Sequence, residues 1–204
     1  SVLMAGDKDL GARVLGILGG GQLAQMMAQV ARPLGIECIA YDPNPDACAQ
    51  RSAELVVGSY DDAAALRAFA ERVDAITYEF ENVPNETVEA LTGLRPIHPG
   101  PEALRVSSER VTEKAFFERC GVAVGQTRPV SGADSARAAR REIGLPAVLK
   151  SCSGGYDGKG QFVVRTDDEL ENAIAQIGNR PFIYEAFVAF ERELSVIACR
   201  DASG

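Results

Sequence analysis

The chain has 204 residues, 46% of them hydrophobic and 25% charged, which is typical of a globular protein with one or two cores. Its net charge of -8 disfavours nucleic acid and anionic membranes as partners, because such partners need clustered Lys and Arg. Five scattered cysteines, no membrane-length apolar run and no signal-peptide core predict a reduced, cytoplasmic protein.

The first hundred residues alternate between strand-like and helix-like segments. Short apolar runs predict strands over 13–18, 36–41, 55–58 and 74–78. Helices are predicted over 22–34 and over 61–72. In the first of them Leu23, Met26, Met27 and Val30 have helical spacing, and Met26 and Met27 are predicted core residues. This alternation predicts a Rossmann-like α/β domain with a doubly wound parallel sheet. Three prolines within 96–101 place its end there, so the predicted domains are 1–100 and 101–204.

The second half follows a different order, in which hairpins replace crossovers. The sequence predicts helices over 109–120, 135–143 and 167–177, with Phe116 and Phe117 as core residues. Strands are predicted over 126–130, 145–150, 162–165, 182–187 and 193–200. This order indicates an α+β unit.

Residues 154–161, with the sequence GGYDGKGQ, form the predicted tip of a hairpin between two apolar strands. Four glycines in seven residues are costly to order, and they allow a backbone to approach an anion closely. Lys150 ends the preceding apolar strand, so its charge needs a partner. These features predict a phosphate-binding flap; the alternative is a mobile surface hairpin.

The loop 19–24 (GGGQLA) matches the G-x-G-x-x-A form of the dinucleotide fingerprint, with Asp42 following 18 residues after Ala24. Taken alone, this pattern indicates a nicotinamide or flavin, but a glycine-rich helix N-terminus suits any phosphate. A tight turn that needs glycine for packing is an equal alternative. Asp42 precedes a rigid Pro43-Asn44-Pro45 turn, which argues against NAD.

A polar group formed by Glu79, Glu81 and Asn82 follows the strand predicted over 74–78. Ligand sites of α/β sheets lie at the carboxyl ends of strands, so this group is a candidate substrate site. A solvated loop is the alternative, and for Glu81 it is equally plausible.

Together, Lys150, 154–161, 184–188 and 190–195 resemble the nucleotide-binding half of an ATP-grasp ligase. With 19–23 and 77–84 (TYEFENVP), the resemblance narrows to the N5-carboxyaminoimidazole ribonucleotide synthetase family. It implies a pre-ATP-grasp domain, then an incomplete ATP-grasp subdomain. It also implies an enzyme of de novo purine biosynthesis that uses ATP and Mg²⁺ to carboxylate 5-aminoimidazole ribonucleotide with bicarbonate, through carboxyphosphate.

The resemblance assigns roles to individual residues. The residues implied in catalysis are Tyr156, Asp157 and Lys159. The implied substrate contacts are Gly21, Gln22, Leu23, Glu79 and Asn82. The implied nucleotide contacts are Arg110, Lys150, Gly155, Tyr156, Asp157, Gly158, Lys159, Gly160, Gln161, Glu185, Ala186, Phe187, Val188 and Glu193.

The chain departs from the family pattern at its end. It stops at Gly204, before the acidic residues that hold magnesium in the family, so no metal ligand is expected within it. The resemblance therefore implies a fragment that does not turn over ATP, from a protein expected to be a homodimer at full length. Its strand over 193–200 would expose an apolar edge, which predicts self-association.

Three other functions stay open. A different ATP-grasp carboxylate–amine ligase would share Lys150 and the flap. A nicotinamide-binding oxidoreductase domain needs only residues 19–42, but it leaves the second unit unexplained. A ligand-binding module without turnover is the third.

Overall fold

The computed structural model describes residues 13–153, 160–198 and 200. The chain divides into two compact units, Ser1–Phe116 and Phe117–Gly204. Among the described residues, no helix has the length and apolar character needed to cross a bilayer.

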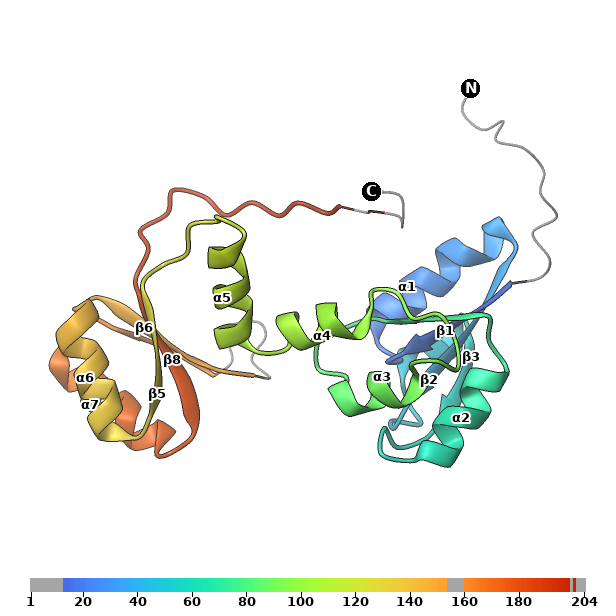
Figure 1. Cartoon of the computed structure of the whole chain (residues 1–204), viewed down its shortest axis with the longest axis horizontal. Coiled ribbons are helices and arrows are strands. Elements are labelled where there is room, and N and C mark those ends of the chain that lie inside the picture. The colour runs from blue at the N-terminus through green and yellow to red at the C-terminus, as the bar shows by residue number, and fades with distance from the viewer. Residues whose placement is uncertain (1–12, 154–159, 199, 201–204) are drawn as a thin grey trace, which may run out of the picture. The chain divides into compact units, whose positions relative to one another are not determined.

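The first unit is built on a parallel four-stranded sheet with the order β3-β2-β1-β4. The strands are β1 (Arg13–Leu18), β2 (Ile36–Asp42), β3 (Glu54–Val57) and β4 (Ala75–Tyr78). The helical segments are α1 (Gln22–Ala31), η1 (Arg32–Leu34), η2 (Cys48–Arg51), α2 (Ala63–Glu71), α3 (Asn85–Leu91) and α4 (Pro101–Ser107). Helices α1 and α2 cover opposite faces of the sheet, which confirms the predicted doubly wound parallel sheet (Figure 1).

The two faces of this sheet follow the two-residue period of its strands. Leu18 and Tyr41 lie in one core cluster with Phe69 of α2. Their neighbours Ile17 and Ala40 lie in a second cluster, with Ala24 of α1. Hydrophobic burial on both faces therefore holds the carboxyl ends of β1, β2 and β4 side by side.

Helix α1 packs on the sheet through small residues. Ala24, Ala28 and Ala31 are buried, because small side chains allow the helix to lie close to the sheet. Leu23, Met26 and Val30 are each more than half exposed, so the predicted core position of Met26 is wrong. Met27 is partly buried against the core.

The second unit contains an antiparallel sheet with the order β5-β8-β6-β7. Its strands are β5 (Thr127–Ser131), β6 (Ala147–Ser151), β7 (Gln161–Val164) and β8 (Pro181–Ala186). Helices α6 (Ala133–Ile143) and α7 (Asp167–Ile177) lie on one face of it (Figure 1). This arrangement confirms the predicted α+β unit and the predicted β6–β7 hairpin.

Helix α5 (Arg110–Arg119) contains the division between the two units. Phe116 and Phe117 on this helix are 39% and 38% exposed, so their predicted core positions are wrong. Leu104 of the preceding helix α4 is buried in the core of the first unit. The boundary predicted at residue 100 stays a prediction.

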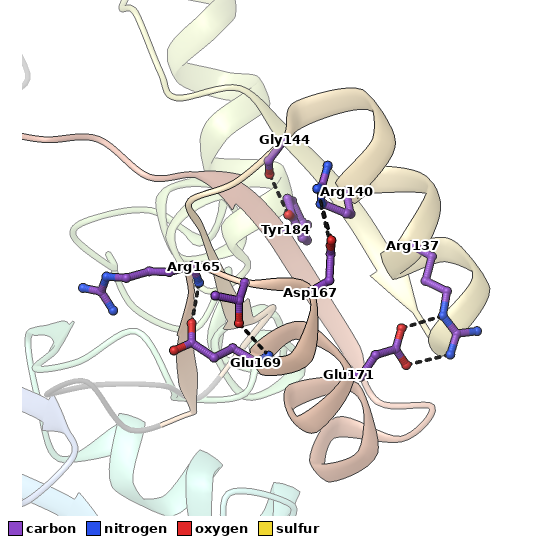
Figure 2. Close-up of polar contacts among 9 residues, drawn as sticks. Arg137, Arg140, Gly144, Arg165, Asp167, Glu169, Glu171 and Tyr184 are labelled. Carbon is purple, nitrogen blue, oxygen red and sulfur yellow. Dashed lines mark hydrogen bonds and ion pairs between the residues drawn. The ribbon is translucent and has the colours of Figure 1, made fainter.

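Polar contacts fasten α6 and α7 to each other and to the sheet (Figure 2). Arg137 forms an ion pair with Glu171 at 2.7 Å, and Arg140 forms one with Asp167 at 2.9 Å. Helix α7 begins at an N-cap, where the Thr166 hydroxyl accepts a hydrogen bond from the Glu169 N–H. Exposed ion pairs contribute little stability, so the apolar core beneath them carries most of it.

The buried hydroxyl of Tyr184 on β8 donates a hydrogen bond to the Gly144 carbonyl at 2.8 Å (Figure 2). We expect Tyr184→Phe to lower the free energy of unfolding by about 1 kcal/mol, because the Gly144 carbonyl loses its donor. Urea unfolding measures this change. Tyr78→Phe is the matched control, because its hydroxyl lies a long 3.5 Å from the Gly100 carbonyl. If both variants lost the same free energy of unfolding, the Tyr184–Gly144 hydrogen bond would not be the source of the effect.

The strand predicted over 193–200 is wrong. The described residues of this segment, 193–198 and 200, are neither helix nor strand. The apolar side chains of Leu194, Val196 and Ile197 are 82%, 89% and 100% exposed. A strand needs a neighbouring strand for its hydrogen bonds, and none of the described strands pairs with this segment. The self-association predicted above therefore cannot rest on an edge strand. It stays a prediction, because Leu194, Val196 and Ile197 expose apolar side chains.

Candidate functional site

Glu79 directly follows β4, and its carboxylate lies at the N-terminus of α1. Oε1 accepts a hydrogen bond from the Gly21 N–H at 2.6 Å, and Oε2 accepts one from the Ala24 N–H at 2.8 Å. The first N–H groups of a helix lack intrahelical acceptors, and the helix dipole favours negative charge beside them. Glu79 therefore ties the end of β4 to the glycine-rich loop and fixes the conformation of that loop.

This close approach explains why the loop is rich in glycine. A Cβ atom at Gly21 would lie 2.6 Å from Oε1 of Glu79. At Gly19 it would lie 2.5 Å from the Glu79 Cγ, and Gly19 also has a φ of +99°, which L side chains rarely adopt. The close contact with Glu79 at both positions and the positive φ of Gly19 therefore favour glycine without any ligand.

A second carboxylate closes the same loop from β2. The Asp42 Oδ2 atom accepts a hydrogen bond from the Gly20 N–H at 2.7 Å, and its Oδ1 atom accepts one from the Asn44 N–H at 2.7 Å. In a dinucleotide-binding domain the loop amides would bind the pyrophosphate and the acidic residue the ribose. Here two carboxylates occupy the N–H groups of Gly20, Gly21 and Ala24. A phosphate at this helix end would have to displace both negative charges.

We therefore expect the chain not to bind NAD, although its loop matches the dinucleotide fingerprint. Calorimetric titration of the 204-residue chain with NAD should give no saturable heat. Heat that saturates at micromolar NAD would contradict the roles given to Asp42 and Glu79.

A second group of predicted site residues lies on the sheet of the second unit. Ala147 and Leu149 of β6 belong to the core cluster under α6 and α7, so Lys150 lies on the opposite face. The Lys150 Nζ is 2.9 Å from Oε2 of Glu185. Glu185 lies on β8, whose antiparallel register places it opposite Val148, so the two charged residues are diagonal neighbours on one face.

The Lys150–Glu185 pair combines a buried carboxylate with a more accessible ammonium group. The side chain of Glu185 is 10% exposed, and that of Lys150 is 29% exposed. An ammonium group has three donors, so Lys150 can keep its bond to Glu185 and still bind phosphate oxygens. Glu185 therefore holds the Lys150 ammonium group in place at the strand end where the glycine-rich hairpin begins, although the pair has no net charge.

Two more predicted residues lie at this end of the sheet. Gln161 is the first residue of β7 and pairs with Lys150 in register. The Gly160 carbonyl accepts a hydrogen bond from the Ser151 N–H at 2.9 Å. The structure thus brings Lys150, Gly160, Gln161 and Glu185 together within the second unit.

The backbone of the predicted adenine segment, 185–188, includes a donor suited to a purine edge. The Ala186 N–H donates to the Gln126 carbonyl at 2.9 Å, and the Phe187 N–H donates to the Pro146 carbonyl at 3.1 Å. The Val188 N–H has no backbone acceptor among the described residues. Within the predicted adenine segment, Val188 therefore carries the N–H that a ligand can use.

Several predicted site residues are not brought into either group. Gly155, Tyr156, Asp157, Gly158 and Lys159 lie outside the described residues. Asn82 and Glu193 are exposed, and Glu193 lies in an irregular segment. Gln22 and Leu23 begin α1 beside Glu79 with exposed side chains, and Arg110 begins α5. Their ligand roles stay predictions.

Within the described part of the chain, no three His, Cys, Asp or Glu side chains gather closely enough to hold a metal ion. The described residues therefore do not by themselves fit a Mg²⁺ site. The expectation that this chain holds no metal ligand stays a prediction.

The side chain of Glu185 is the site residue that the sequence interpretation missed, because only its backbone was given a role. A signal was present: Glu185 is the only acidic residue of the apolar strand Pro181–Ala186, and Lys150 likewise ends an apolar strand. Two opposite charges in neighbouring buried strands indicate a pair. The register that joins them is not visible in the sequence.

Comparisons with known proteins agree with both units. A model of the ribonucleotide synthetase preATP-grasp domain matches residues 12–108, and a model of the ATP-grasp domain matches residues 115–204. Over 190 residues the chain is 42% identical to N5-carboxyaminoimidazole ribonucleotide synthase of Pseudomonas aeruginosa, covering 93% of this chain and 53% of that protein.

Solved structures show the same fold. One is an ADP complex of N5-carboxyaminoimidazole ribonucleotide synthetase, with a TM-score of 0.84, 36% identity, and coverage of 89% of this chain and 48% of that chain. Another is the synthase of Aspergillus clavatus in complex with ADP and 5-aminoimidazole ribonucleotide, with a TM-score of 0.77 and 26% identity. It covers 88% of this chain and 48% of that chain.

The parallel sheet lies in the residues that match the pre-ATP-grasp model, and the antiparallel sheet lies in those that match the ATP-grasp model, so the chain belongs to the ATP-grasp class of proteins. Within that class, the chain belongs to the N5-carboxyaminoimidazole ribonucleotide synthetase family. It spans about half the length of the curated relatives it matches.

Proposed function

We propose that this chain is the nucleotide-binding half of an enzyme that carboxylates 5-aminoimidazole ribonucleotide with ATP and bicarbonate. By the full-length protein we mean a protein of the relatives' length that contains this chain. The observation that carries the proposal is the Lys150 ammonium group, held 2.9 Å from buried Glu185 beside the glycine-rich hairpin. The relatives with bound ADP and 5-aminoimidazole ribonucleotide support it.

The proposed carboxylation takes place in three steps. A bicarbonate oxygen attacks the γ-phosphorus of ATP, which forms carboxyphosphate and releases ADP. The C–O bond to the phosphoryl group then breaks, giving CO₂ and inorganic phosphate. The exocyclic amine of 5-aminoimidazole ribonucleotide attacks the CO₂ carbon and loses a proton, which leaves the N-carboxy product.

Within this reaction, the residues of the second unit bind and orient ATP. Lys150 neutralises charge on the α- and β-phosphates, while Glu185 holds its ammonium group in place. The Val188 N–H donates to the adenine edge, which sets the position of the triphosphate along the sheet. Tyr156, Asp157 and Lys159 close over the reacting groups and exclude water from the labile acyl phosphate.

The first unit binds the ribonucleotide. Gly21, Gln22, Leu23, Glu79 and Asn82 follow the carboxyl ends of β1 and β4, where α/β sheets place ligands. Magnesium is part of the proposal because phosphoryl transfer from ATP needs its charge, although no step is assigned to it through the described residues. We further propose a cytoplasmic homodimer as the state of the full-length protein.

Release of ADP by the full-length protein, measured with each substrate omitted in turn, tests this function. We expect turnover only when ATP, bicarbonate and 5-aminoimidazole ribonucleotide are all present. The same assay with other carboxylate and amine substrates tests the alternative of a different ATP-grasp ligase. Turnover without bicarbonate, supported by another carboxylate, would overturn the proposal in favour of that alternative.

A further inference from the structure

Tyr60 lies just after β3, at the carboxyl edge of the first sheet. Its hydroxyl oxygen is buried and has no hydrogen-bond partner among the described residues. Its ring packs against Tyr41, with centroids 6.0 Å apart, and its carbonyl accepts a hydrogen bond from the Thr87 hydroxyl at 3.1 Å. Both the ring and the backbone are therefore held in place, and only the hydroxyl is unsatisfied.

The protein groups around this hydroxyl are already engaged. The Gly19 N–H lies near it but donates to the Tyr41 carbonyl at 2.9 Å. The carboxylates of Asp42 and Glu79 bind loop amides. Burial, and then the negative charges of Asp42 and Glu79, raise the pKa of Tyr60 far above its ordinary value. The phenol is therefore a permanent donor in a negatively charged setting.

A buried hydroxyl without a partner weakens folding, and a phenylalanine would fill the same space without that penalty. A ligand atom that accepts a hydrogen bond removes the penalty. A phosphate is disfavoured here because two carboxylates would repel it. A neutral sugar hydroxyl fits, because it accepts from Tyr60 and at the same time donates to a remaining lone pair of Asp42 or Glu79.

We propose that Tyr60 is a binding residue for the ribose of the ribonucleotide substrate, to which its hydroxyl donates a hydrogen bond. This inference rests on the function proposed above and adds a residue outside the glycine-rich loop and the Glu79 segment. It assigns the ribose, and not the 5′-phosphate, to the carboxyl edge of the first sheet.

The test is Tyr60→Phe in the full-length protein, with affinity for 5-aminoimidazole ribonucleotide measured by calorimetry. We expect affinity to fall about tenfold, as for a lost hydrogen bond in a dry site, while the KM for ATP stays unchanged. Stability should not fall, because the hydroxyl has no protein partner to lose. Tyr184→Phe is the control: it should lose stability and keep ribonucleotide affinity.

Deoxyribose analogues of the substrate, each lacking one ribose hydroxyl, identify the contact. For one of them, the loss of affinity should be about tenfold larger in the unsubstituted protein than in Tyr60→Phe, where the ribose hydroxyl keeps only its bond to Asp42 or Glu79. Two results would overturn the inference about Tyr60 and leave the proposed function intact. Tyr60→Phe could bind 5-aminoimidazole ribonucleotide within twofold of the unsubstituted protein, or every analogue could lose the same affinity in both proteins. An unsubstituted protein that binds no 5-aminoimidazole ribonucleotide would overturn the proposed function as well.

Discussion

Replacing Lys150 by methionine is expected to raise the KM for ATP of the full-length protein about a hundredfold, with little change in affinity for 5-aminoimidazole ribonucleotide. Two charge-assisted hydrogen bonds to phosphate, at about 1.5 kcal/mol each, give this factor. The ribonucleotide should be unaffected because its proposed contacts lie in the other unit. Steady-state kinetics with each substrate varied in turn measures both quantities.

Lys150→Met also leaves the buried carboxylate of Glu185 without the Lys150 ammonium group, at a cost of about 1–3 kcal/mol in the free energy of unfolding. The double variant Lys150→Met with Glu185→Gln removes both charges and should recover most of that stability. Its ATP affinity should stay low, because the phosphate contact of Lys150 is still missing. This comparison separates a lost phosphate contact from a damaged fold.

Arg165→Met is the matched control for Lys150→Met. Arg165 immediately follows β7 of the same hairpin, and it is exposed, with its side chain directed away from the labelled contacts (Figure 2). Its loss should leave the KM for ATP within about twofold, in keeping with a surface charge. If Lys150→Met leaves the ATP kinetics unchanged, or if both variants lose ATP affinity equally, Lys150 is not the phosphate-binding residue.

The second large effect is expected at Glu79. We expect Glu79→Gln to lower the free energy of unfolding by about 2–3 kcal/mol. A carboxylate accepts from both Gly21 and Ala24, whereas an amide must present its NH₂ group to one of these two N–H donors. Loss of the negative charge at the α1 N-terminus adds to the effect. Urea unfolding of the 204-residue chain measures the change.

Glu81→Gln is the control for this prediction, because Glu81 lies two residues away with an exposed side chain. Its stability should change by less than about 0.5 kcal/mol, which is usual for an exposed charge. A Glu79→Gln variant as stable as Glu81→Gln would mean that the carboxylate does not hold the glycine-rich loop.

Local residue patterns predicted most of the architecture. Apolar strand-like runs that alternate with helix-like segments predicted the parallel sheet of the first unit. The apolar runs on either side of 154–161 predicted the β6–β7 hairpin. Helix α1 shows where this reasoning fails. Its large apolar residues suggested the buried face, but the residues buried by close packing on the sheet are Ala24, Ala28 and Ala31.

The site was less predictable than the fold, because its contacts join residues that are distant in sequence. Glu79 lies 55 residues from Ala24, and Lys150 lies 35 residues from Glu185. The glycine fingerprint suggested a phosphate at the α1 N-terminus, with a glycine packing turn as the equal alternative. In the structure the carboxylates of the chain's own Asp42 and Glu79 bind the N–H groups of Gly20 and Gly21. The orphaned Tyr60 hydroxyl has no sequence signal, because its lack of a partner is a property of the folded chain.

The most direct test of the proposed function is the fate of oxygen when the full-length protein turns over with ¹⁸O-labelled bicarbonate, ATP and 5-aminoimidazole ribonucleotide. Phosphoryl transfer to bicarbonate, followed by C–O cleavage, leaves one bicarbonate oxygen in the phosphate. We therefore predict inorganic phosphate with one ¹⁸O per turnover, measured by mass spectrometry before bicarbonate exchanges with water. Phosphate without ¹⁸O, formed at the same rate as ADP, would contradict the proposed function.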